Sequence, residues 1–141
     1  MIFLFHIFSY DIWFYISHIL LHKIDYLHKM HRIHHEEFNH FGMTFLNGMH
    51  YHILEIPFQN IGFFVPLLFL PFSRKSFFKA MCFISFRTLV RHDQRWTHVV
   101  GNHHILHHHY PDYNFGEFWL DYLFGTVYPN KISYIYGIFF L

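Results

Sequence analysis

Apolar residues gather in long runs, separated by short polar segments that are rich in histidine. The first run covers residues 2–21, IFLFHIFSYDIWFYISHILL. As a helix it would rise about 30 Å, the thickness of the hydrocarbon core of a bilayer. No basic segment precedes it and no small-residue cleavage site follows, so we expect a membrane-spanning helix and not a secretory signal. His6, Asp11 and His18 are costly in lipid, so we expect them to face protein or the interface.

The second apolar block covers residues 53–90 and turns back on itself. Its first arm, 53–72, contains three prolines, which bend a membrane helix without forbidding it. A polar turn at 73–76 reverses the chain, and Lys79 and Arg87 leave the returning arm short for a full span. We predict a helical hairpin that crosses or deeply enters the membrane. The alternative is a buried hairpin of a soluble core, which the low charged content of 13% disfavours.

This arrangement puts residues 22–52 and 91–141 on one side of the membrane. Of the ten Lys and Arg residues, seven lie on or near that side and three lie around the opposite turn. Cytoplasmic segments carry the excess of basic residues, so we expect the shared face in the cytosol, at the endoplasmic reticulum of a eukaryote or the inner membrane of a bacterium. The expected fold class is all-α, with residues 1–141 forming a single integral membrane helical domain that has a cytosolic histidine-rich helical cap.

Composition excludes several classes of protein. The chain is 53% hydrophobic and 24% aromatic, which rules out disorder. Its net charge of +1 provides no basic field for a phosphate backbone, so no nucleic-acid partner is expected. A single cysteine, Cys82, excludes an internal disulfide framework and a multi-cysteine zinc site. Histidine is the exception, at 17 of 141 residues.

Many of the histidines fall into three clusters at helical spacing. The clusters are His18 and His22, then His31, His34 and His35, and finally His104, His107 and His108. Residues at i, i+3 and i+4 share one face of a helix, so each cluster converges its ring nitrogens. A lone histidine is often only a polar core residue, but eight together exceed the needs of one zinc site. They predict two transition metals, and imidazole suits iron, zinc, copper and nickel alike.

The order of these motifs resembles the fatty acid hydroxylase superfamily, the sterol desaturase-like integral membrane di-iron enzymes. His52-Ile-Leu-Glu55 is similar to the H-x-x-E element that precedes the family's hairpin. The segment 87–92 resembles the one that carries a further family histidine, here His92. Two final motifs, Asn114-Phe-Gly116 and the segment 119–126, are similar to the N-Y-G…W-D-x-L-F-G-T ending. The resemblance covers most of residues 18–126.

The resemblance implies O2-dependent hydroxylation or desaturation of a lipid in the membrane. It implies two iron ions as cofactor, with zinc as a substitute, and a cytochrome b5-type or other electron donor as partner. The metal ligands it implies are His18, His22, His31, His34, His35, His52, His92, His104, His107 and His108. His50 competes with His52, and His103 with His104, although only His104 keeps the i, i+3, i+4 register.

This chain departs from the family pattern in two places. Many relatives carry a second histidine where this chain has Trp96. Relatives also usually carry additional N-terminal membrane helices, so we expect a domain that is short at its N-terminus.

Acidic residues beside the clusters are candidates for orienting the imidazole rings. Glu36 and Glu37 follow the middle cluster, and Asp93 and Asp112 adjoin the ligand segments. A carboxylate that accepts a ring N–H fixes the tautomer of a ligand, although a solvated helix surface explains the two glutamates equally well. Asp121 is expected to be structural. The remaining histidines near the clusters are expected at the surface or behind the ligands; these are His28, His40, His98 and His109.

Two other functions stay open. One is a non-catalytic membrane protein that binds zinc. The other is a bis-histidine haem protein of electron transfer, using a pair such as His18 and His35. The triplet spacing argues against haem, because two axial ligands would leave most of each cluster idle. For an enzyme, the apolar helices suit sterols, acyl chains and carotenoids equally.

Overall fold

The computed structural model describes residues 1–36 and 43–139, which form helices and no strands. The α-helices are α1 Ile2–Lys23, α2 Asp25–Glu36, α4 Glu55–Asn60, α5 Arg74–Arg91, α6 Thr97–Val100, α7 His103–His109 and α8 Phe118–Phe124. Short 3-10 segments are η1 Asn47–Met49, η2 Ile61–Phe63, η3 Val65–Leu68, η4 Gln94–Trp96 and η5 Lys131–Ser133. The all-α prediction is confirmed for this part of the chain.

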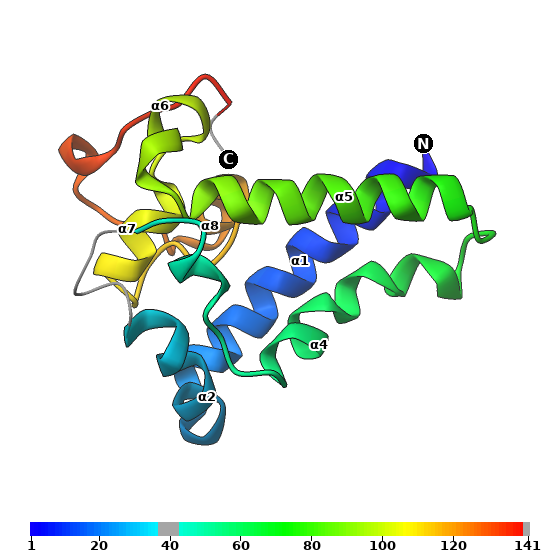
Figure 1. The fold of residues 1–141 in the computed structure, drawn as a ribbon, viewed down its shortest axis with the longest axis horizontal. Coiled ribbons are helices and arrows are strands. Elements are labelled where there is room, and N and C mark those ends of the chain that lie inside the picture. Colours follow the sequence, from blue (N-terminus) through cyan, green and yellow to red (C-terminus); the bar gives the residue numbers. More distant parts are fainter. Residues whose placement is uncertain (37–42, 140–141) are drawn as a thin grey trace.

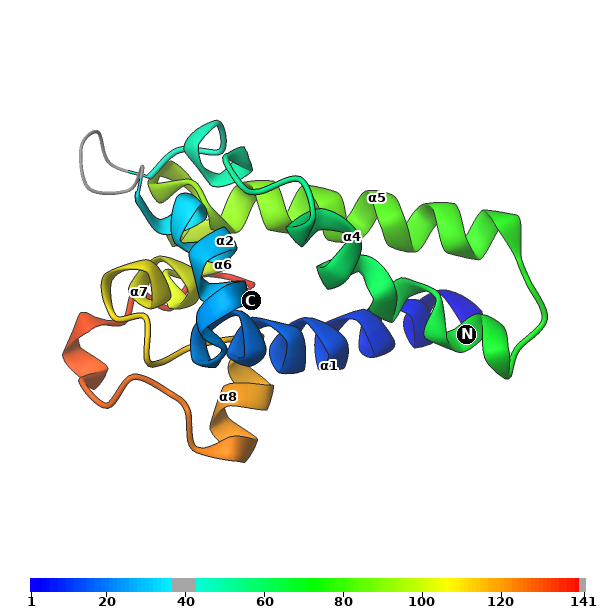
Figure 2. The ribbon, with the colours of Figure 1, turned by 90° about the horizontal axis from the view of Figure 1, so that it is seen from below.

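Three rods extend in one direction from a cap of short helices (Figure 1). The rods are α1, α5 and the segment from α4 to η3, and the N-terminus lies at their far end. The cap contains α2, α6, α7 and α8, and the second view shows the same separation (Figure 2). A buried apolar cluster joins the rods, with Tyr10 and Phe14 of α1, Phe63 of η2, and Ala80 and Ile84 of α5.

The two arms of the predicted hairpin are not alike. The first arm is a succession of short helical segments, because prolines at 57, 66 and 71 each remove a backbone N–H donor. The second arm is the continuous helix α5, whose N-terminal cap is Ser73, with its hydroxyl accepting a hydrogen bond from the Ser76 amide. In the described residues, α1 is the one helix that is long and apolar enough to cross a membrane.

The polar residues inside α1 face protein, as expected. His6 is buried, and its Nδ1 lies 2.8 Å from the carbonyl oxygen of Phe63. Asp11 is buried in an ion pair with Arg87 of α5. Arg87 also lies 3.3 Å from Glu117, which in turn accepts a 2.5 Å hydrogen bond from Arg91. This buried network ties α1 and α5 to the segment that leads into α8.

Candidate metal centre

The fold brings the histidine clusters together at the end of α1, where α2, α7 and the end of α5 meet. Nine imidazoles form two groups, and within each group the ligand atoms lie within 4.8 Å of one another. The first group is His18, His22, His31, His35 and His107; the second group is His34, His92, His104 and His108. Each i, i+4 pair stays in one group, whereas the i+3 member of each triplet joins the other. Both α2 and α7 therefore contribute to two adjacent sites, where the spacing alone suggested one convergent face.

The Nε2 atoms within each group face one another closely. The separations are 3.0 Å for His18–His31, 3.1 Å for His31–His35, 3.1 Å for His22–His107, 3.1 Å for His34–His92 and 2.8 Å for His92–His104. Two imidazoles that bind one ion at about 2.1 Å have nitrogens about 3 Å apart. The donor atoms therefore fit one transition-metal ion in each group.

The other ring nitrogen of most grouped histidines is held by a hydrogen-bond acceptor. The Nδ1 atom of His18 lies 2.5 Å from the carbonyl oxygen of Phe115, and Nδ1 of His107 lies 2.7 Å from the carbonyl oxygen of Tyr113. In the second group, Nδ1 of His34 lies 3.2 Å from the carbonyl oxygen of His50, and Nδ1 of His92 lies 2.6 Å from that of Thr88. His31 differs, because its Nδ1 lies 2.8 Å from a side-chain atom, Oε1 of Glu55. Donation from Nδ1 leaves the Nε2 lone pair pointing into the group, which is the tautomer that binds metal.

Burial keeps these imidazoles neutral. It lowers the pKa of His34 to about 4 and the pKa of His35 to about 2. The pKa values of His92, His104 and His107 also fall well below the ordinary range, first because of burial and then because of neighbouring histidines, with Arg91 adding to the shift at His92 and His104. Metals bind neutral imidazole, so the ligand set is ready near neutral pH.

The acid that orients a ligand is not one of those expected from the sequence. Three of the expected acids pair instead with basic side chains: Glu36 with Arg32, Asp93 with Arg95 and Asp112 with Lys23. Glu37 lies outside the described residues. Glu55, which is only 2% exposed, binds His31 and also accepts from Gln59. The H-x-x-E motif was the signal for this residue, although it directed attention to His52.

His52 belongs to neither group. It lies before α4, where its Nδ1 accepts a 3.3 Å hydrogen bond from the Leu54 amide. His50 contributes its backbone carbonyl to His34. Nε2 of His103 lies 3.0 Å from Asp121, whose carboxylate also accepts from two backbone amides, which confirms a structural role for Asp121. Of the remaining histidines, His28, His98 and His109 are exposed and outside the groups, and His40 is not among the described residues.

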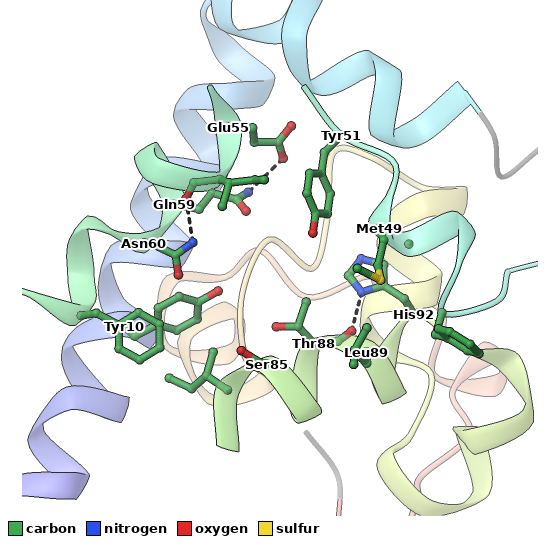
Figure 3. Close-up of a pocket in the computed structure, with 15 residues that line it drawn as sticks. Tyr10, Met49, Tyr51, Glu55, Gln59, Asn60, Ser85, Thr88, Leu89 and His92 are labelled. Atoms are coloured by element: carbon green, nitrogen blue, oxygen red, sulfur yellow. Dashed lines mark hydrogen bonds between the residues drawn. The ribbon is translucent and has the colours of Figure 1, made fainter. Parts of the chain in front are cut away.

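A cavity of about 270 Å³ lies beside the second group, between α1, α4 and α5 (Figure 3). His92 forms part of its wall. A narrow space of about 40 Å³ shares Tyr10, Tyr51 and Thr88 with this cavity and reaches His18 and His34. A small molecule in the cavity would therefore lie next to the second group, and the narrow space connects this region to His18 of the first group.

A comparison with protein families identifies the chain. The family model described as fatty acid hydroxylase matches residues 3–126, a range that contains all nine grouped histidines. No curated protein and no solved structure gives a significant match. Because the family model covers most of the sequence, this chain belongs to the fatty acid hydroxylase family.

Proposed function

We propose that this protein is a membrane-bound di-iron oxidoreductase that hydroxylates or desaturates a lipid, with O2 as oxidant and a cytochrome b5-type or similar electron donor. The observation that carries the proposal is the pair of adjacent imidazole groups beside a cavity. The proposed ligands of the two iron ions are the nine grouped histidines. Iron held there supplies redox chemistry toward O2 and an unactivated C–H bond.

The chain's own residues prepare the site for that chemistry. Backbone carbonyls and Glu55 orient the rings, so the Nε2 atoms converge in the folded chain. Burial excludes water from the ligands, with His18, His104 and His107 each at most 3% exposed. The cavity between α1, α4 and α5 holds the lipid against the second group.

The surface of the rods supports a place in the membrane. Large apolar side chains are exposed along all three rods; they include Leu4, Phe5, Phe8, Ile12 and Ile16 on α1, Leu68 of η3 and Phe69 beside it, and Phe78, Met81, Phe83 and Phe86 on α5. Soluble monomers rarely expose apolar patches of this extent. We propose that the rods lie in the bilayer and that the histidine cap faces the cytosol.

One rival function keeps a specific observation in its favour. Four buried imidazoles in the second group match the coordination number of a structural zinc ion, so a non-catalytic zinc relative is the second candidate. A bis-histidine haem is not supported. Nε2 of His18 and Nε2 of His35 both lie against His31, which leaves no space for a porphyrin between that pair.

The proposal is tested on purified protein reconstituted with iron, a chemical or enzymatic reductant and a lipid extract. We expect O2 uptake and a product that has gained one oxygen or lost two hydrogens, measured by mass spectrometry. The control is a variant in which His34 and His92 are both replaced by alanine. If the protein as purified contains zinc, and the protein reconstituted with iron takes up no O2, the second candidate is favoured.

A further inference from the structure

Tyr10 carries an unsatisfied hydroxyl in the cavity. Its ring is only 4% exposed, because it packs against Phe14 and Phe63 with ring centroids 5.8 and 4.8 Å away. Among the described residues, its hydroxyl has no hydrogen-bond partner, although the residue lines the cavity. A buried phenol hydroxyl normally finds a partner, so this one is available to a ligand.

Two further hydroxyls turn toward the same space. Ser85 and Thr88 lie on the cavity side of α5, and Figure 3 shows their oxygens directed toward the region that the Tyr10 hydroxyl enters. Gln59 and Asn60 of α4 add two amides to the wall. Every one of these groups is neutral, and each hydroxyl can both donate and accept a hydrogen bond.

The described lining contains no lysine or arginine and includes the acid Glu55. A carboxylate or phosphate ligand would leave water without a basic side chain in the lining to pair with its charge, which is unfavourable in a buried site. A pure hydrocarbon would leave the Tyr10 hydroxyl unpaired. The cavity therefore favours an oxygen-bearing but uncharged molecule.

We infer that the substrate is a neutral lipid with a hydroxyl head group, bound by Tyr10 and Thr88, and is not a free fatty acid. This inference rests on the proposed function and names the substrate class for the same site. Thr88 precedes His92 by four residues, which corresponds to a rise of about 6 Å along the helix. A head group held at Thr88 thus places the carbons a few bonds away beside the second imidazole group.

The test is binding without turnover. The full chain is placed in nanodiscs, and the protein-dependent excess of tritiated 1-decanol, decane or decanoate over empty nanodiscs is measured at equilibrium. We expect saturable binding of decanol, with decane and decanoate bound at least about fivefold more weakly, as expected for one hydrogen bond near 1 kcal/mol. Binding of decane or of decanoate as tight as that of decanol would overturn the inference.

Variants locate the site. Tyr10→Phe removes one oxygen and is expected to weaken decanol binding about two- to tenfold while leaving decane binding unchanged. Thr88→Val should weaken decanol binding in the same direction, and it keeps the test open if Tyr10→Phe does not fold. The matched control is Tyr122→Phe, which removes a hydroxyl from a residue that is 74% exposed on α8. Decanol affinities in both cavity variants equal to that of the control would overturn the inference.

These measurements separate the two proposals. Because no catalysis is involved, a protein that lacks metal and O2 uptake but prefers decanol contradicts only the proposed enzyme activity. A protein that oxidises lipid but binds decanoate as well as decanol contradicts only the assignment of the substrate class.

Discussion

The Nε2 atoms of His22 and His107 lie 3.1 Å apart, although 85 positions separate the two residues in the sequence. This contact joins α1 to α7 within the first group. Because His107 belongs to the first group only, replacing it shows whether the two groups bind metal separately. We expect the wild-type protein to bind about two metals per chain and His107→Ala to bind about one. Elemental analysis of purified protein measures the ratio. His98→Ala, at an exposed histidine outside both groups, is the control, and an unchanged ratio in His107→Ala would contradict the assignment.

Acid should weaken the metal-free protein. The pKa of His34 is lowered by burial to about 4, whereas an unfolded histidine titrates near 6.5. Between these values the unfolded chain binds more protons, so stability is complete above about pH 6.5 and falls as the pH drops toward 4. At pH 5 the loss from this group is about 2 kcal/mol. Denaturant unfolding at pH 7 and pH 5 measures it, and His34→Gln should show a smaller difference between the two values.

Glu55 should control metal affinity through His31. Glu55→Ala removes the acceptor that lies 2.8 Å from Nδ1 of His31, which frees the ring to rotate. Losing such an outer partner typically weakens metal binding by about 10- to 100-fold. Glu55→Gln keeps an acceptor and should lose less. Competition with a chelator measures the affinity, and Glu36→Gln, which affects only an exposed pair with Arg32, should match the wild type.

Gly48 should be essential to the second group for steric reasons. A Cβ atom at this position would overlap the ring of His92. We expect Gly48→Ala to displace that ligand and to lower the metal content of the protein. Gly125→Ala is an informative comparison, because its φ of 72° disfavours a side chain, yet nothing lies within 4 Å of the added atom. That variant should lose about 1 kcal/mol of stability while keeping its metal.

The buried ion pair between Asp11 and Arg87 should matter more than exposed pairs. Asp11→Asn leaves the Arg87 charge partly uncompensated inside the protein, with an expected loss of about 3–5 kcal/mol. Lys23→Gln breaks an exposed pair with Asp112 and should cost less than about 1 kcal/mol. Thermal unfolding in one detergent compares them. Equal losses in the two variants would show that Glu117 alone holds Arg87.

Some of this structure was accessible from sequence because it depends on local spacing. The i, i+4 pairs, such as His31 with His35, are close on any helix, and the apolar run of α1 predicts its length directly. The position of Asp11 also followed from physics, since a carboxylate inside an apolar run needs a partner in the protein.

Other features depend on how distant segments meet. The division of α2 and α7 between two groups is set by the direction from which α1 and α5 approach, and no local pattern encodes it. The selection of Glu55 over Glu36 follows the same rule, because Glu55 comes from a segment that folds back against α2. The fragmented first arm of the hairpin shows that three prolines interrupt a helix more than they bend it here.

The ring Nδ1 atoms of His18, His34, His92 and His107 are held by backbone carbonyl oxygens, and this affects which substitutions the site tolerates. A main-chain oxygen is the same atom in every amino acid, so replacing Phe115, Tyr113 or Thr88 does not remove the anchor as long as the chain keeps its path. The orientation of these imidazoles therefore does not depend on which side chains occupy those positions. A search for equivalent sites in other proteins should compare the course of the backbone behind each histidine and give little weight to the identity of the residue found there.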